Sequence, residues 1–206
     1  MAERIKLNKV TLREQKQKLA MYERFLPALE ARKQQFLMQL AVVRKEIQEQ
    51  EAVLNEKMNA ISLWSPLYWD MEGMLPFFIH IREVKIIWRN VAGLKVPEFQ
   101  SVIFEEPHYS LFATPYSFDQ VVQKTREAIF IREKTLVLKQ EEHILSEGFR
   151  KTSQRINLYE QRLIPGCREA IRKIAVYLQD QQAAAVGVAK VAKALSEEAS
   201  YYGVSR

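Results

Sequence analysis

Apolar side chains recur every seven residues through the first part of the chain. The series begins at Leu12 and continues at this spacing to Ile61, and Lys33 is its single polar member. A second series stands three positions later and is apolar at four of its seven positions. This pattern has a period of 3.5 residues and predicts a coiled-coil helix. Such a helix would be roughly 75 Å long at ~1.5 Å per residue and would need a partner helix along its apolar stripe.

The last part of the chain supplies that partner. A helical pattern resumes near Asp119 and becomes strictly sevenfold after Ile156. This arm is about 30 residues longer than the first, so part of it must protrude or pack on the middle of the chain. Pro27 and Pro165 lie inside the periodic runs; since the heptad phase continues across Pro27, we expect a kink there, not an end. Thr11, followed three positions later by a glutamate, has capping-box spacing and predicts the start of the first helix.

These patterns predict a mainly α fold: a long antiparallel two-helix coiled coil with a small β-hairpin-containing head inserted between the helices. The expected segments are the N-terminal helix (1–61), the head (62–118) and the C-terminal helix (119–206). The coiled-coil seam is expected to consist of Leu12, Leu19, Leu26, Leu29, Phe36, Leu40, Val43, Ile47 and Leu54 from the first arm and Ile156, Leu163, Cys167, Ile174, Tyr177, Val188 and Leu195 from the second.

The middle segment has a different composition. It holds all three tryptophans and five of the seven prolines, which excludes a long helix. Residues 90–93 predict a turn in which Gly93 takes a positive φ. Strand-like runs cover residues 77–81, 84–88 and 102–104, with a short return strand at 94–97. So small a head buries little core alone, so its aromatic side chains are expected to pack on the arms or on another chain.

Charge changes the picture little. The formal net charge is +6, divided as +4, −2 and +4 over residues 1–60, 61–118 and 119–206. Basic and acidic residues alternate along the arms, which favours a solvated helix surface over a nucleic-acid site. No apolar run is long enough to span a membrane, and the first ten residues contain no signal core, so neither insertion nor export is expected. The lone Cys167 fits a reducing compartment and is expected to be a small packing residue.

No motif for catalysis, for a metal or for a cofactor is present. His80, His108 and His143 are scattered without ligand spacing. The adjacent pairs at 105–106 and 141–142 are glutamates whose side chains should diverge, so they are poor acid–base dyads. We therefore expect no catalytic residue, no metal site and no cofactor in this chain.

Residues 150–165 resemble a segment of the D subunit of V-type and A-type rotary ATPases that reads roughly Lys-Thr-x-Arg-Arg-Val-Asn-Ala-Leu-Glu, then Ile-Pro. Gln154, Leu158 and Tyr159 depart from that pattern, and residues 179–183 replace an acidic-basic run of the family. Residues 90–97 are similar to the family's Gly-Val-x-Val-Pro hairpin, and residues 7–40 have its leucine and lysine spacing. The family-motif positions that match are Thr152, Arg155, Asn157, Glu160, Ile164 and Pro165.

The resemblance implies a central rotor-stalk subunit that is not itself catalytic. Its coiled coil would stand inside the A/B catalytic hexamer and transmit torque to the membrane ion-translocating ring, during ATP-driven H⁺ or Na⁺ transport or ATP synthesis. Its head would join the F subunit and the d/C-type adaptor, in the cytoplasm and peripheral to the membrane. The head residues expected at that interface are Phe77, Ile79, Ile86, Trp88, Gly93, Val96 and Pro97.

Two other classes of function stay open on the residues alone. A coiled-coil scaffold or membrane-surface adaptor would set its basic arms against anionic lipid and have no role in ion transport. A nucleic-acid-binding coiled coil would show steep salt dependence. The interspersed acidic residues argue against both.

Overall fold

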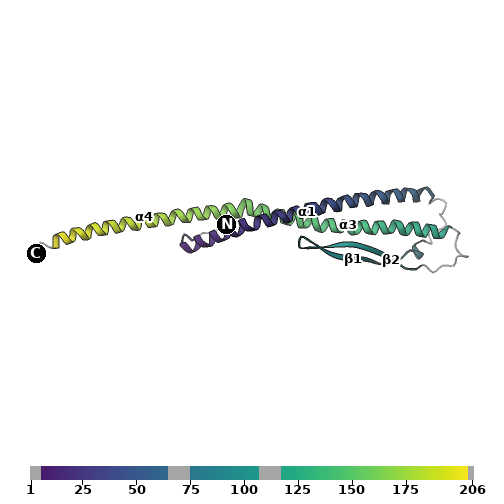
Figure 1. The fold of residues 1–206 in the computed structure, drawn as a ribbon, viewed down its shortest axis with the longest axis horizontal. Coiled ribbons are helices and arrows are strands. Elements are labelled where there is room, and N and C mark those ends of the chain that lie inside the picture. The colour runs from purple at the N-terminus through teal and green to yellow at the C-terminus, as the bar shows by residue number, and fades with distance from the viewer. Residues whose placement is uncertain (1–5, 65–74, 107–116, 204–206) are drawn as a thin grey trace. The chain divides into compact units, whose positions relative to one another are not determined.

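Two long helical arms flank a β-hairpin in the order of the chain (Figure 1). The computed structural model describes residues 6–64, 75–106 and 117–203, so His108 lies outside the described residues. The elements are α1 (Lys9–Trp64), α2 (Leu75–Phe78), β1 (Ile81–Val91), β2 (Leu94–Phe104), α3 (Phe118–Leu158), a π-helical segment η2 (Tyr159–Leu163) and α4 (Ile164–Gly203). The predicted fold class, two helical arms around an inserted hairpin, is confirmed.

The chain divides into two compact units, and each contains part of both arms. The arm unit comprises Met1–Glu30 and Gln154–Arg206, and the hairpin unit comprises Ala31–Ser153. The division predicted from sequence, at residues 61 and 118, follows the segments of the chain and stays a prediction.

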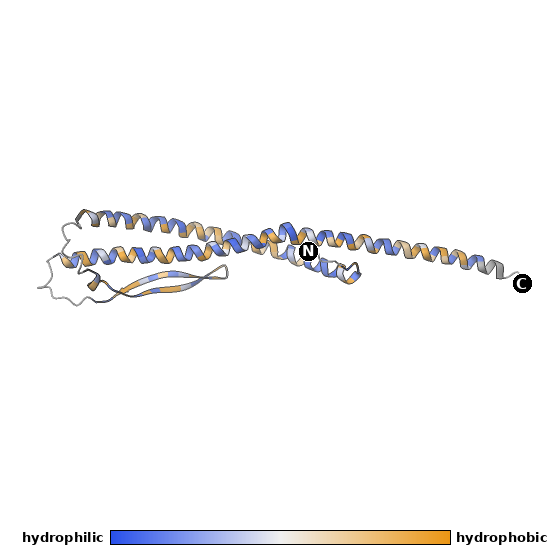
Figure 2. Ribbon diagram, turned by 180° about the vertical axis from the view of Figure 1, so that it is seen from behind, coloured by the Kyte–Doolittle hydropathy of each residue, from blue (hydrophilic) through white to orange (hydrophobic). Residues whose placement is uncertain are grey.

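In the hairpin unit, α1 and α3 pack against each other along an apolar seam. The buried cluster takes four residues from α1 at a/d spacing, with Leu138 and Leu145 from α3 and Val96 from β2. Polar and apolar residues alternate along the helices (Figure 2), as one buried stripe on each requires. Four ion pairs join the two helices: Arg44–Glu142, Glu46–Lys134, Glu51–Lys139 and Lys57–Glu127. The earliest α1 partner pairs with the latest α3 partner and the latest with the earliest, as in an antiparallel pair.

The hairpin closes in a two-residue turn. Ala92 and Gly93 have φ values of 49° and 82°, the pair of positive values that a type I′ turn requires. The Gly93 amide donates a 2.9 Å hydrogen bond to Oδ1 of Asn90. The predicted turn and the positive φ of Gly93 are confirmed.

Both strands are 11 residues long, so the return strand is longer than expected. The expected strand at residues 77–81 is wrong except at Ile81, because Phe77 and Phe78 belong to the short helix α2 and β1 begins at Ile81. Pro76 fits the first turn of a helix, where its missing amide costs nothing. The apolar run around it is too short for periodicity to separate helix from strand.

In the arm unit, the first helix starts earlier than predicted. The Thr11 amide donates a 2.6 Å hydrogen bond to Oδ1 of Asn8, so Asn8 is the cap and α1 begins at Lys9. Pro27 lies inside α1 without ending it, as expected. The rings of Tyr22 and Tyr159 pack with centroids 5.2 Å apart, which joins α1 to η2.

The π-helical segment ends two residues before Pro165. The Ile164 amide bonds to the carbonyl of Tyr159, five residues back. A proline in a regular α-helix lacks one donor and clashes with the carbonyl four residues earlier. The wider π turn relieves that conflict, so the helical path continues into α4.

Candidate functional site

Only some of the head residues predicted to contact a partner are exposed at the surface. Phe77 and Trp88 are exposed, at 75% and 60%, and Ile86 is exposed at 37%. Ile79 is half-buried and Gly93 is exposed in the turn. Val96 and Pro97 are buried within the chain itself, so they support the hairpin from inside and are not offered at its surface. The surface that a partner can reach is therefore carried by α2 and β1.

One ion pair holds β1 beside α3. Nη2 of Arg89 donates to Oε1 of Glu141 at 3.1 Å, and the Glu141 side chain is 4% exposed. Nε of the same arginine lies 3.7 Å from Glu98 on β2. Burial raises the pKa of the Glu141 carboxyl above its ordinary value, and the Arg89 hydrogen bond opposes that rise. A buried acid thus fixes which residue of β1 faces α3.

Sequence reasoning missed this pair. Leu138, Glu141 and Leu145 stand at i, i+3 and i+7 on α3, so the sequence places an acid on the apolar face of the helix. A buried acid is retained in proteins only with a partner, which was the available signal. The expected divergence of the adjacent glutamates is seen, since Glu142 pairs with Arg44 on α1.

The tip of the hairpin packs on both helices. Gly148 of α3 has no side chain, and a Cβ built there would lie 2.2 Å from Cδ1 of Leu94 and 3.4 Å from the Phe36 ring. The Thr152 hydroxyl donates to the Gly148 carbonyl at 2.8 Å. The missing side chain thus leaves the space in which Leu94 packs, one turn before the family-motif threonine.

The other family-motif residues belong to the arm unit, where Ile164 is buried and the remaining ones lie on the surface. Arg155, Asn157 and Pro165 are exposed and Glu160 is at the surface of η2, whereas Thr152 is buried. Glu160 belongs to η2 and Pro165 to the first turn of α4. The motif therefore marks the place where the C-terminal arm changes from α-helix to π-helix and back.

The predicted seam residues differ in exposure along the chain. Phe36, Leu40, Val43, Ile47, Ile156, Cys167 and Ile174 are buried, and Leu12, Leu19, Leu26, Leu29, Leu54 and Leu163 are half-buried. Tyr177, Val188 and Leu195 are exposed at 38%, 70% and 60%. Every residue from 179 to 198 is exposed, so α1 does not cover this part of α4. Burial raises the pKa of the Cys167 thiol, so the thiol stays protonated and suits a packing position.

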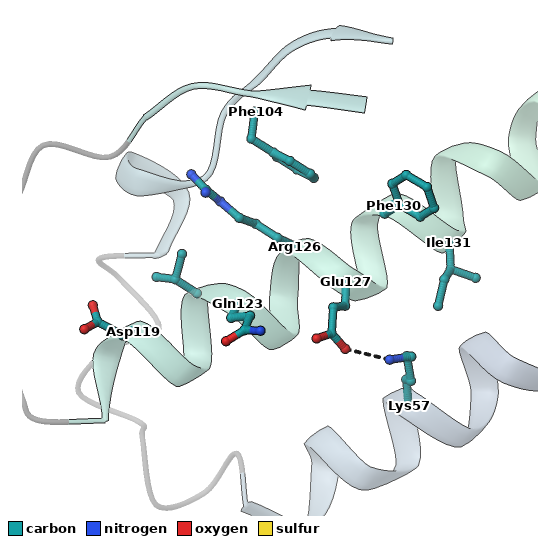
Figure 3. Close-up of a pocket in the computed structure, with 9 residues that line it drawn as sticks. Lys57, Phe104, Asp119, Gln123, Arg126, Glu127, Phe130 and Ile131 are labelled. Carbon is teal, nitrogen blue, oxygen red and sulfur yellow. Dashed lines mark hydrogen bonds and ion pairs between the residues drawn. The ribbon is translucent and has the colours of Figure 1, made fainter. Parts of the chain in front are cut away.

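A cavity of 560 Å³ opens between α1, α3 and the end of β2 (Figure 3). Lys57 and Glu127 pair across it at 2.6 Å, and this hydrogen bond lowers the pKa of the Glu127 carboxyl. Arg126 lies over the Phe104 ring and donates to the Glu105 carbonyl at 2.7 Å. The lowered pKa keeps the Glu127 carboxyl ionised, which suits a structural contact between helices better than acid–base chemistry. The cavity is lined by Lys57, Phe104, Asp119, Val122, Gln123, Arg126, Glu127, Phe130 and Ile131.

Two further findings concern the described residues alone. Within residues 6–64, 75–106 and 117–203, no three histidine, cysteine or acidic side chains gather closely enough to hold a metal ion. No helix within the same ranges has the length and hydropathy needed to cross a bilayer.

Long helical arms with a β-hairpin inserted between them and packed on α3 define the class of this protein, a helical hairpin with an inserted β-hairpin. The family described as the ATP synthase D subunit matches residues 11–194. The V-type ATP synthase D subunit of Borreliella burgdorferi is 36% identical over 196 residues, which cover 92% of this chain and 94% of the relative. The protein of the same name from Chlamydia caviae is 34% identical over 200 residues, with 94% of both covered. The chain belongs to the ATP synthase D subunit family, which confirms the resemblance found in its sequence.

Proposed function

We propose that this chain is the central rotor-stalk subunit of a V-type or A-type ATPase and has no catalytic site of its own. It transmits torque between the A/B catalytic hexamer and the membrane ion-translocating ring, for ATP-driven H⁺ or Na⁺ transport or for ATP synthesis. In this role it is cytoplasmic and peripheral to the membrane. Membership of the D subunit family supports the assignment to the complex.

The contact between α1 and α3 in the hairpin unit is the observation that carries the torque proposal. A shaft must resist rotation of one strand against the other. An apolar seam with four ion pairs across it opposes sliding and twisting, because either motion would expose buried side chains and separate charges. Of the seam residues named from the sequence, Phe36, Leu40, Val43 and Ile47 lie in this contact and are proposed to serve this purpose.

The head is proposed to join the F subunit and the d/C-type adaptor. Exposed apolar side chains on α2 and β1, among them Phe77 and Trp88, support a protein interface there. The exposed stretch of α4, residues 179–198, is proposed to contact the A/B hexamer. Its exposed Val188 and Leu195 would then be covered by other subunits of the complex.

Coupling in the reconstituted ATPase tests the torque proposal. Leu40→Asp places a charge at a position that is 4% exposed, whereas Met38→Asp places it at one that is 70% exposed. The first variant should hydrolyse ATP without transporting ions, and the second should resemble the unchanged protein. Full coupling in Leu40→Asp, with the variant demonstrably assembled in the complex, would reject the proposal.

Partner binding tests the head separately. Mixing the chain with a homologue of the F subunit should raise its melting temperature and shift its elution volume, since ligands of the folded state stabilise it. Trp88→Ala should weaken this effect while the helical content stays constant. Unchanged melting and elution with both the F homologue and the adaptor would remove the head from the proposed coupling role.

A further inference from the structure

We propose that the outer edge of β1 binds an extended, acidic segment of a partner subunit as a third strand of the sheet. This proposal rests on the proposed function of the head and specifies how the head binds. Within the described residues the sheet has two strands, so the edge of β1 opposite β2 has no neighbouring strand there. Such an edge presents unpaired backbone donors and acceptors.

Exposure distinguishes β1 from β2. Every residue from Ile81 to Asn90 except Val84 is exposed. In β2, by contrast, Val96 and Pro97 are buried and the last four residues are half-buried. The hairpin lies alongside α3 (Figure 1), with the Phe99 ring of β2 5.1 Å from that of Phe130. The edge of β1 is thus the accessible one.

The register shows which backbone groups of β1 face outward. Val91 and Leu94 flank a two-residue turn, so they form a hydrogen-bonded pair, and hydrogen-bonded and non-hydrogen-bonded pairs alternate from there. This phase turns the amides of Ile86, Trp88 and Asn90 away from β2.

Proline supports the same phase independently. Pro97 is the partner of Trp88 and has no amide to donate, so this pair must be one of the non-hydrogen-bonded pairs. The register shifts lie at or before Lys85/Ile86 and leave the outer residues of β1 regular up to the turn. Three donor and acceptor sets therefore point outward at the spacing that a pairing strand needs.

Charge identifies the kind of strand. Arg82, Lys85 and Lys95 form no ion pair within the part of the chain that the structure describes. In these two described strands, Glu83 is the sole acid without a partner, since Glu98 lies beside Arg89. The hairpin surface is therefore basic, which favours an acidic strand and disfavours pairing with a second copy of this chain, whose edge is equally basic.

Amide exchange of the full chain, measured residue by residue, tests the proposal directly. On addition of the F-subunit homologue or the adaptor homologue, exchange of the outward amides of Ile86, Trp88 and Asn90 should slow about tenfold. The amides of Ile87 and Arg89, which face β2, should be protected already. Binding that leaves the three outward amides unchanged would overturn the edge proposal and leave the proposed function standing.

Two variants at one position separate backbone from side chain. Ile86→Ala removes the side chain and keeps the amide, whereas Ile86→Pro also removes the outward donor. Proline should weaken binding about tenfold more than alanine does. Equal loss in both variants would show a side-chain interface and contradict strand addition. The protection of the Ile87 and Arg89 amides verifies that the hairpin is intact in each variant.

Charge and oligomeric state complete the test. Lys85→Glu should weaken binding, and added salt should weaken binding of the unchanged chain. Protection of the outward amides in a dimer without any partner would identify a second copy as the occupant and overturn the acidic-partner proposal. Absence of binding to either homologue would overturn this proposal together with the coupling role of the head.

Discussion

Arg89 on β1 and Glu141 on α3 form the ion pair that joins the hairpin to the C-terminal arm, with Nη2 and Oε1 3.1 Å apart. The two side chains differ in exposure, at 44% for the arginine and 4% for the glutamate. The arginine reaches inward from the surface of the sheet, and the acid is almost wholly shielded from water. Loss of the arginine would leave the acid buried without its partner.

Arg89→Met should therefore lower the free energy of unfolding. Because Arg89 is partly exposed, solvent screens the pair, and we expect about 1–3 kcal/mol, less than a fully buried pair would lose. Denaturant unfolding measures this. Lys45→Met removes a surface pair whose side chains are 79% and 60% exposed, and it should change stability by less than about 0.5 kcal/mol. Equal effects in the two variants would contradict a stabilising role for the buried pair.

Glu141→Gln should change how stability depends on pH. Burial raises the pKa of Glu141 in the folded state above the ordinary 4.5. At pH values between the unfolded-state pKa and the raised folded-state pKa, the folded chain therefore binds more protons than the unfolded chain. Stability contributed by this group is then lost as the pH rises through that window. The glutamine variant should thus gain stability relative to the unchanged chain as the pH rises from about 4 to 7. Parallel pH curves would indicate an unshifted carboxyl.

Gly148→Ala should destabilise the hairpin unit, because the new Cβ would lie 2.2 Å from Leu94 Cδ1. Overpacking of this kind costs about 1–3 kcal/mol. Gly166→Ala is the matched control, since nothing lies within 4 Å of its Cβ position, and it should be neutral or stabilising by up to about 1 kcal/mol. Unfolding of both variants measures the difference. Shortening Leu94 to alanine should offset part of the Gly148→Ala loss, and simple additivity would argue against this contact.

Ala92→Asn should stabilise the hairpin turn. Ala92 holds a φ of 49°, which asparagine tolerates better than alanine in a type I′ turn. A gain of about 0.5–1 kcal/mol would raise the melting temperature by roughly 1–4 °C. Ala92→Val should act in the opposite direction, because β-branched residues disfavour positive φ. A lower melting temperature for the asparagine variant would contradict the turn type.

Periodicity and turn chemistry are why so much of the fold could be predicted. A long heptad run predicts the helix directly, and Gly93 three residues after Asn90 predicts the turn. The helix start was misplaced because Asn8 and Thr11 both carry capping oxygens, and the choice depends on the path of the chain before the helix. The π turn could not be predicted either. Pro165 indicates a missing donor and a steric clash within the helix, but it does not indicate how the backbone relieves them.

The candidate site was harder to predict for a physical reason. Exposed and buried apolar residues of a strand are of the same types. The sequence therefore predicted both Trp88 and Val96 at the partner interface, although Trp88 is exposed and Val96 is buried. The burial of a strand depends on which edge meets the helix, and this follows from tertiary packing. The Arg89–Glu141 pair connects residues 52 positions apart, and no local pattern joins them.

Glu141 and Glu142 are neighbours on α3, yet one is bonded to the hairpin and the other to α1. A force on β1 is therefore transmitted to the turn of α3 that also forms an ion pair with α1, in the N-terminal arm. The hairpin, α3 and α1 are thus linked through two adjacent residues, Glu141 and Glu142. Sideways displacement of the hairpin would therefore strain the contact between α3 and α1.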